Sequence, residues 1–144
     1  MTEIPDKATL DALNNTVVDE FRVKGGKPGG QFEGKDLLLL TTTGAKSRQS
    51  RLAPLAYLTI DGKMIVVGSL GGADHHPDWV HNLRAKPHAY IEVGTEAYDV
   101  TARELPPDEH EDTFPKVVAL EPVFGEYQAR TKRVLPLFEL RRSE

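Results

Sequence analysis

The chain has 144 residues, 39% of them hydrophobic and 28% charged, a length and composition that suit one globular domain. Its net charge of −4 argues against non-specific binding of nucleic acid, and the absence of cysteine excludes disulfides, a thiolate nucleophile and a cysteine zinc site. Because no apolar run reaches the roughly 18 residues of a membrane span and the first residues lack the hydrophobic core of a signal peptide, we expect a cytoplasmic protein, with peripheral contact at a membrane left open.

The N-terminal part of the chain is expected to form a helix and a connector. Apolar residues recur at helical spacing over residues 8–21: Leu10, Leu13, Val17 and Phe21. Residues 24–35 (KGGKPGGQFEGK) then hold five glycines and one proline, which is typical of a mobile connector that folds over a site when a ligand fills it. We therefore expect residues 1–36 to form a helix and connector, followed by one folded domain over residues 37–144.

Six short strands are expected in the remainder of the chain. Their apolar or β-branched runs cover residues 37–43, 52–60, 64–69, 89–93, 97–104 and 134–140. Asp61-Gly62 lies between the second and third runs and predicts a tight hairpin, because such a turn needs positive φ values. Gly94-Thr95 occupies the same position between the fourth and fifth runs. Pro136 indicates that part of the last strand lies at a sheet edge, because proline has no N–H to donate.

Two helical regions are expected among these strands. The sequence PDWVHNLRAKP, residues 77–87, starts with a proline and an aspartate that suit the first turn of a helix, and it ends with a proline. Residues 107–133 have helical character but are interrupted by Pro115 and Pro122. Six mostly antiparallel strands with a few helices predict a mainly β protein of the α+β class, built as a small β-barrel with helical additions.

A cluster of cations follows the first predicted strand. In TTTGAKSRQSR, residues 41–51 and called the basic loop below, Lys46, Arg48 and Arg51 fall within six positions. The segment is not a Walker phosphate loop, because Ala45 stands directly before Lys46, where that motif requires glycine. The residues alone leave two interpretations open: an ordinary solvated turn, or a site for a small anion or anionic tail to which hydroxyls such as that of Ser47 also donate.

The remaining candidate groups favour structural roles. Potential metal ligands gather around the start of the predicted helix: Asp74, His75, His76, Asp78 and His81. They lack two histidines at i and i+4, the spacing of a helical zinc site, so we expect no metal. Trp79 is interpreted as a core anchor, and Phe114, Phe124 and Tyr127 as either core residues or one wall of an aromatic pocket. No GxSxG motif is present for acyl-transfer chemistry.

Several ordered blocks of the chain resemble the deazaflavin-dependent nitroreductase family. The blocks are LLLLTTTGAKSRQSRLAPLAYL (37–58), DGKMIVVGSLGG (61–72), PDWVHNLRAKP (77–87), DVTARELP (99–106) and, more weakly, EYQARTKRVLPLFEL (126–140). The resemblance implies a split β-barrel like that of FMN-binding proteins, with coenzyme F420 (8-hydroxy-5-deazaflavin) as the cofactor. It also implies a reductase that transfers a hydride from reduced F420 to a flat acceptor, such as a quinone, a nitroaromatic compound or an unsaturated lactone.

The resemblance further implies roles for individual residues. Lys46, Ser47 and Arg51 are expected to hold the phosphate and oligoglutamate tail of the coenzyme. The ring is expected between the second strand, the end of the third strand and the helix that follows. The complete expected coenzyme-binding set is Lys46, Ser47, Arg51, Leu52, Ala53, Pro54, Leu55, Val67, Gly68, Ser69, Asp78, Trp79, Val80 and Asn82. Ser69 and Tyr127 are the expected catalytic residues, which orient the acceptor or relay a proton.

The match to the family's acceptor pocket is looser than the match to its coenzyme site. Where members that reduce bicyclic nitroimidazoles carry tyrosines, this chain has Ala56, Glu121 and Phe124, although it retains Tyr127 and Ser69. The resemblance therefore implies quinone reduction, with weak or no activity on bicyclic nitroimidazoles.

Two alternatives stay open from the sequence: a split-barrel oxidoreductase that binds FMN, and a non-catalytic carrier of F420. The expected partner is a small-molecule acceptor, quinone-like or nitroaromatic, and no nucleic acid or stable membrane insertion is expected. The chain is expected to be a monomer or a weak homodimer.

Overall fold

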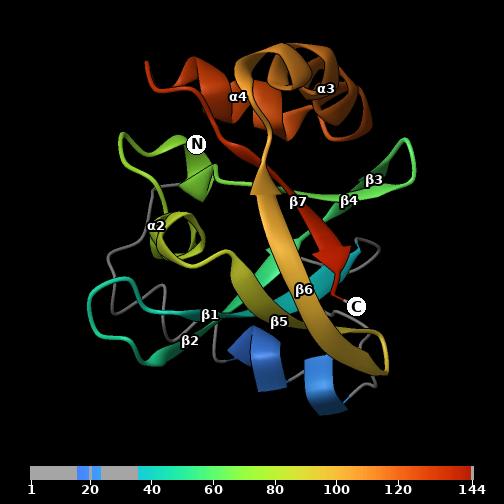
Figure 1. The fold of residues 1–144 in the computed structure, drawn as a ribbon. Helices are drawn as coiled ribbons and strands as arrows, with labels where there is room; N and C mark the ends of the chain where they lie inside the picture. The colour runs from blue at the N-terminus through green and yellow to red at the C-terminus, as the bar shows by residue number, and fades with distance from the viewer. Residues whose placement is uncertain (1–15, 20, 24–35, 144) are drawn as a thin grey trace.

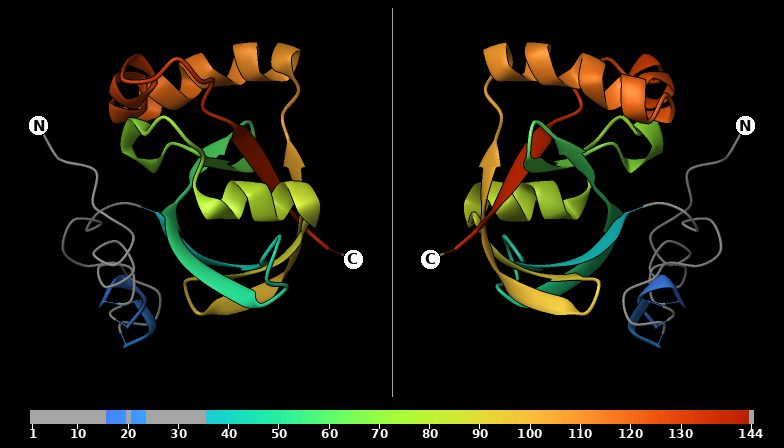
Figure 2. Two further views of the ribbon diagram at one scale, coloured as in Figure 1. Left: turned by 90° about the vertical axis from the view of Figure 1, so that its left-hand side faces the viewer. Right: turned by 90° about the vertical axis from the view of Figure 1, so that its right-hand side faces the viewer.

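An antiparallel sheet of seven strands is the framework of the protein, whose computed structural model describes residues 16–19, 21–23 and 36–143. The strands are β1 (Leu37–Thr43), β2 (Ser50–Ala56), β3 (Leu58–Ile60), β4 (Lys63–Val67), β5 (His88–Val93), β6 (Glu96–Glu104) and β7 (Leu137–Arg142). They lie in the order β2-β1-β5-β6-β7-β4-β3. The sheet curls strongly, and one helix lies on its concave side (Figures 1 and 2). This arrangement confirms the predicted mainly β split barrel.

The sheet has seven strands instead of the six expected, because the predicted strand at 52–60 is two strands. At Tyr57 the backbone leaves the ladder, and the Tyr57 N–H donates to the carbonyl of Asp36 at 3.0 Å. On one side of this break β2 pairs with β1, whereas on the other side β3 pairs with β4. The chain thus passes from one end of the sheet order to the other at a single residue.

Both predicted hairpins are confirmed. Asp61 and Gly62 have φ values of 53° and 77° and join β3 to β4, whose residues Ile60 and Lys63 face each other. Gly94 has a φ of 59° and lies in the turn between β5 and β6. Left-handed backbone at these positions gives the turn a twist that matches the twist of the strands.

The prediction that the last strand lies at an edge was wrong. β7 begins after Pro136 and pairs with β6 on one side and β4 on the other, so it lies inside the sheet. Pro136 is accommodated because only its carbonyl is needed: it accepts a hydrogen bond from the Gly68 N–H at 2.8 Å.

Within residues 36–143 the helices are α2 (Asp78–Ala85), α3 (Pro107–Leu120) and α4 (Val123–Ala129), and a 3-10 turn η2 spans Leu70–Gly72. Pro122 separates α3 from α4 as expected, but α3 continues through Pro115. The carbonyl that loses its helical partner at Pro115 belongs to Glu111, which is exposed and can bond to water instead.

The concave side of the sheet and α2 enclose the largest part of the core. Trp79, Val80 and Leu83 of α2 pack against Leu38 and Leu40 of β1 and against inward residues of the other strands. Leu37 and Leu39 of β1 point to the opposite face, since side chains alternate along a strand. Figure 2 places α2 in the hollow of the sheet, with α3 and α4 above it.

Two smaller clusters cover the outer face. Helices α3 and α4 pack over β3, β4 and β7 through residues that include Val117 and Leu135. Residues 16–19 and 21–23 are helical, as predicted for this part of the chain, and place Val18 and Phe21 on the outward side of β1. An ion pair of 2.9 Å between Arg22 and Glu92 ties this helical segment to β5. The remainder of the predicted N-terminal helix and the connector at 24–35 lie outside the described residues.

None of the helices in the described part of the chain is long and apolar enough to cross a membrane.

Candidate functional site

The basic loop connects β1 to β2 and has one tightly determined backbone path. The Gly44 N–H donates to the carbonyl of Gln49 at 2.8 Å, and the Arg48 N–H donates to the carbonyl of Gly44 at 2.9 Å. A Cβ atom on Gly44 would overlap the hydroxyl of Ser47. Gly44 therefore lets the loop fold back on itself, and the Ser47 hydroxyl packs against the Gly44 backbone.

Helix α2 fixes the position of this loop through one buried side chain. Asn82 is 5% exposed, its Oδ1 accepts a hydrogen bond from the Ala45 N–H at 2.9 Å, and its Nδ2 donates to Thr42 Oγ1 at 3.0 Å. Both ends of the amide are thus used to join α2 to the end of β1. Asn82 therefore contacts the loop from the side of the core, and the opposite side of the loop faces solvent.

The three cations of the basic loop lie on that outer surface. Lys46, Arg48 and Arg51 are exposed, and none of them forms an ion pair with another described residue. Arg51 Nη2 lies 3.4 Å from Ser47 Oγ, a weak contact that draws the guanidinium and the hydroxyl together. Some arginines elsewhere in the fold are paired, for example Arg84 with Glu104 and Arg103 with Glu109. The basic loop, in contrast, brings three exposed cations without an ion-pair partner among the described residues together within six positions.

Residues of β2 divide between the two faces of the sheet. Arg51, Ala53 and Leu55 stand opposite Thr42, Leu40 and Leu38, respectively, on the face that meets α2. Leu52 and Pro54 stand opposite Thr41 and Leu39 on the other face, where Leu52 is 38% exposed and Pro54 is buried. A ligand on the concave side can reach the side chains of the first group, but only the backbone of the second group.

The α2 members of the expected coenzyme-binding set lie mostly in the core. Trp79 is 7% exposed and meets the ring of Phe138 edge-on, with 5.7 Å between ring centroids. Val80 is fully buried, whereas Asp78 is exposed in the first turn of the helix. Trp79 and Val80 therefore hold α2 in the hollow of the sheet.

Close packing at the end of β4 requires glycine. A Cβ atom on Gly68 would lie 2.7 Å from Pro136 Cγ and 2.7 Å from Val80 Cγ2. The preceding residue, Val67, is buried and points to the other side, into the cluster beneath α3 and α4. Gly68 thus lets the chain pass between α2 and the segment before β7 and reach Ser69.

Ser69 and Tyr127, the expected catalytic residues, belong to adjoining structures. Ser69 is 9% exposed and precedes η2. Helix α4 packs against this turn so closely that a Cβ atom on Gly72 would lie 2.7 Å from the Tyr127 carbonyl oxygen. The Tyr127 ring is half-buried, lies edge-on to Phe124 at 6.0 Å between centroids, and has the Arg130 guanidinium 5.3 Å above it.

The three positions at which the family's pocket tyrosines are replaced lie in two places: Glu121 and Phe124 are neighbours, with the Phe124 N–H donating to the Glu121 carbonyl at 3.1 Å, whereas Ala56 lies on another element. Ala56 ends β2, Glu121 follows the end of α3, and Phe124 lies in the first turn of α4, all of them half-buried. Phe124 and Tyr127 pack against the cluster beneath α3 and α4, so they are partly core residues.

One residue that contacts the backbone around Ser69 was not predicted from the sequence. Arg133, between α4 and β7, donates hydrogen bonds to the backbone carbonyls of Gly68, Ser69 and Ala73. Its partners are main-chain atoms about sixty positions away, which leave no mark in side-chain types or spacing. The sole pointer in the sequence was that Arg133 falls within the block 126–140 that resembles the family.

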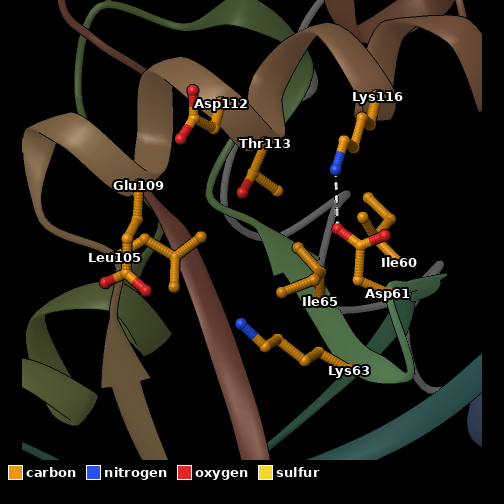
Figure 3. A pocket seen from close by; sticks show the side chains of 9 residues that line it. All are labelled: Ile60, Asp61, Lys63, Ile65, Leu105, Glu109, Asp112, Thr113 and Lys116. Carbon is orange, nitrogen blue, oxygen red and sulfur yellow. Dashed lines mark hydrogen bonds and ion pairs between the residues drawn. The ribbon is translucent and has the colours of Figure 1, made fainter.

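A separate pocket of about 200 Å³ lies between α3 and the β3–β4 hairpin (Figure 3). Ile60, Ile65 and Leu105 contribute apolar side chains to its lining. Some of the charges at its rim are paired: Lys116 with Asp61 at 2.6 Å and Glu109 with Arg103 at 2.6 Å. None of its lining residues belongs to the expected coenzyme-binding set, so this pocket is distinct from the candidate site.

Within residues 16–19, 21–23 and 36–143, no three histidine, aspartate or glutamate side chains come together in a group that could hold a metal ion.

Comparisons with known proteins cover most of the chain. The model of a family described as F420H(2)-dependent quinone reductase matches residues 13–141. The F420H(2)-dependent quinone reductase Rv1261c of Mycobacterium tuberculosis is 34% identical over 128 residues, which are 85% of this chain and 85% of that protein. A solved structure of an F420-H2 dependent reductase, FDR-A, is 38% identical and has a TM-score of 0.65, covering 74% of this chain and 94% of its own. Another solved structure, described as a domain-swapped dimer, is 33% identical with a TM-score of 0.68, covering 91% of this chain and 98% of its own.

Proposed function

Since the chain belongs to the F420H(2)-dependent quinone reductase family, we propose that it catalyses transfer of a hydride from reduced coenzyme F420 to a quinone. The relatives named for this activity are about one third identical over most of the chain, and the matched range includes every residue of the candidate site.

The observation that carries the proposal is the unpaired positive charge of the basic loop. Lys46 and Arg51 are exposed beside the Ser47 hydroxyl, and no described carboxylate neutralises them. A phosphate with a chain of glutamates presents oxygen atoms that accept charge-assisted hydrogen bonds from such groups. Because Asn82 and the Gly44 turn already order the backbone of the loop, binding does not need to order that backbone. The residues therefore fit an anionic coenzyme tail.

We assign the ring of the coenzyme to the concave side of β2, next to the basic loop. Ala53 and Leu55 are half-buried there and offer apolar side chains to a flat ring. When bound, the deazaflavin supplies a hydride from a ring carbon, so two electrons move together. Reduction of a quinone to a hydroquinone also needs one proton, and we assign acceptor orientation and proton transfer to Ser69 and Tyr127.

We further propose a quinone-like small molecule as the acceptor, a cytoplasmic location, and a monomer or weak homodimer in solution. The dimer is included because one similar solved structure is a domain-swapped dimer. Light scattering across a range of protein concentrations measures the mass of the particle and distinguishes a monomer of 15.9 kDa from a dimer.

Steady-state turnover with reduced F420 and menadione tests the activity directly. We expect oxidation of reduced F420, followed at the absorption of the deazaflavin, to depend on enzyme and on menadione. Binding of F420 without turnover of any quinone would indicate a carrier, and purification with bound FMN and no affinity for F420 would indicate a flavoprotein. Either result would contradict the proposed function.

The coenzyme-tail site is tested by charge removal in the basic loop. Lys46→Ala and Arg51→Ala should each weaken F420 binding by about one to two decades, because a hydrogen bond to a charged group contributes about 1.5–3 kcal/mol. Lys86→Ala is the matched control, since it removes an exposed charge at the end of α2, outside the loop. Equal affinity in wild type, both loop variants and the control, measured by fluorescence titration, would refute the tail site.

A further inference from the structure

The turn that carries Ser69 has an unusual backbone. Leu70, Gly71 and Gly72 have φ values of 44°, 63° and 86°, so three consecutive residues lie in the left-handed region. Glycine adopts this region readily, but Leu70 does not, and a non-glycine residue remains there only when its surroundings hold it. The segment from Gly68 to Ala73 therefore needs an external constraint.

Two arginines supply that constraint. Arg133 donates from Nε to the Ala73 carbonyl at 2.8 Å, from Nη1 to the Gly68 carbonyl at 3.0 Å, and from Nη2 to the Ser69 carbonyl at 2.7 Å. Arg130 Nη1 donates to the Gly71 carbonyl at 3.1 Å. The planar fork of a guanidinium can reach several acceptors with a fixed mutual geometry, which a lysine ammonium cannot reproduce.

Arg133 is itself held in place from both sides. The two ends of the Gln128 amide bond the Arg133 carbonyl at 2.7 Å and the Leu135 N–H at 3.0 Å, so the segment between α4 and β7 has a defined path. Within the part of the chain that is described, Arg133 forms no ion pair with a carboxylate. Its hydrogen-bonding capacity is therefore directed to the backbone that surrounds Ser69.

The other partner of Arg133 can titrate. Arg133 Nη1 donates to His76 Nδ1 at 2.9 Å, so this nitrogen is an acceptor and the neutral ring carries its proton on Nε2. Burial lowers the pKa of His76, and the charges of Arg133, Arg84 and His81 lower it further, whereas Glu104 opposes them. Protonation of His76 would remove the acceptor and place a second cation against the guanidinium.

We propose that Arg133 is a positioning residue of the reductase, which holds Ser69 in place for the acceptor, with His76 as its proton-sensitive partner. This inference rests on the proposed function for its effect on turnover, but the restraint on the 69–72 turn stands on the hydrogen bonds alone. The coenzyme tail binds elsewhere, at the basic loop, so Arg133 acts mainly on the acceptor.

The test compares Arg133→Lys with Lys132→Ala, which removes a neighbouring exposed charge. We expect Arg133→Lys to lower kcat/KM for menadione about tenfold or more, since a small misplacement in a site can lower the rate about a hundredfold. The dissociation constant of F420 should change less than about threefold, because the charge-assisted contacts to the coenzyme tail persist in this variant. Lys132→Ala should match the wild type. Unchanged kcat/KM in Arg133→Lys would overturn the proposal.

Two further readouts separate positioning from a general loss of structure. Amide hydrogen exchange without coenzyme should accelerate in Arg133→Lys at residues 70–73 and remain at the wild-type rate in α2. His76→Asn keeps an acceptor at the Nδ1 position but does not titrate, so the fall of kcat/KM on acidification should be shallower than in the wild type. Equal exchange in both proteins, or identical pH profiles, would contradict the inference. Absence of turnover in the wild type would instead contradict the proposed function and leave the exchange result to decide the restraint.

Discussion

Replacing Asn82 by leucine should loosen the basic loop from within the core. The substitution retains a side chain of similar size but removes the acceptor for the Ala45 N–H and the donor to Thr42 Oγ1. Thr42 is 3% exposed, so its hydroxyl cannot exchange the lost partner freely for water. Two hydrogen bonds at about 0.5–1.5 kcal/mol each, together with one buried hydroxyl left unsatisfied at about 1–3 kcal/mol, give a loss of about 4 kcal/mol in the free energy of unfolding.

Urea denaturation and thermal melting measure this loss. For a domain of this size the expected decrease in Tm is about 14 °C, since 1 kcal/mol corresponds to about 3–4 °C. Thr42→Val is the matched control: it removes one of the two hydrogen bonds and leaves the Ala45 bond to Asn82 in place, so F420 affinity should fall in Asn82→Leu but stay near the wild-type value in Thr42→Val.

The double variant Thr42→Val, Asn82→Leu tests whether the two residues stabilise the fold through the same hydrogen bond. Because both single changes break the same hydrogen bond, their combined effect on stability should be smaller than the sum of the two. Strict additivity, or a loss below about 0.5 kcal/mol in Asn82→Leu, the range of an ordinary surface substitution, would refute the role given to Asn82.

Three other predictions follow from the packing, the ion pairs and the acceptor pocket. Gly68→Ala should lower the free energy of unfolding, measured by urea denaturation, by about 1–3 kcal/mol, because the new Cβ would overlap Val80 and Pro136. A smaller loss would show that Val80 and Pro136 can move apart to accommodate a methyl group. Burial raises the pKa of Glu139, but hydrogen bonds from Arg141 and Arg103 outweigh it and leave the pKa below its ordinary value near 4.5. The folded state then holds the Glu139 proton less tightly than the unfolded state, so the stabilisation from the ionised carboxylate is present above pH 4.5 and is lost as the pH falls further. The free energy of unfolding of Glu139→Gln should therefore depend less on pH in the acid range than that of the wild type. Equal pH slopes in the two proteins would contradict this role of Glu139. Steady-state assays should give faster turnover of menadione than of a bicyclic nitroimidazole, because Ala56, Glu121 and Phe124 supply no phenolic hydroxyl; the opposite order would contradict this view of the acceptor pocket.

Local signals in the sequence predicted the elements of the fold. Asp61-Gly62 predicted the β3–β4 hairpin because few residue pairs accept its positive φ values, and the apolar run at the start of β1 predicted a strand, which the structure buries on both faces. The break at Tyr57 gave no comparable signal, since Leu58 and Thr59 form strands as readily as the residues before them. Whether the chain changes partners there depends on tertiary contacts such as the bond to Asp36.

The candidate site was predictable to the extent that its chemistry resides in side-chain type. The cations of the basic loop stood out against an acidic chain, whereas the support from Asn82 did not, because an asparagine in a helix has many uses. Side-chain type did not single out Arg133, since it contacts carbonyl oxygens that every residue possesses. The sequence of β2 indicates that successive side chains alternate between the two faces of the sheet, but which of them face α2 is given only by the register with β1.

The most direct test of the central claim compares two ligands: intact F420 and a truncated deazaflavin that keeps the ring but lacks the phosphate and the glutamates. Each is titrated against the wild type, Lys46→Ala and Arg51→Ala, with Lys86→Ala as the control for charge. If the basic loop holds the tail, the loop variants should lose about one to two decades of affinity for intact F420 and none for the truncated ligand. Equal losses for both ligands, or for neither, would contradict the assignment of the coenzyme tail to this loop.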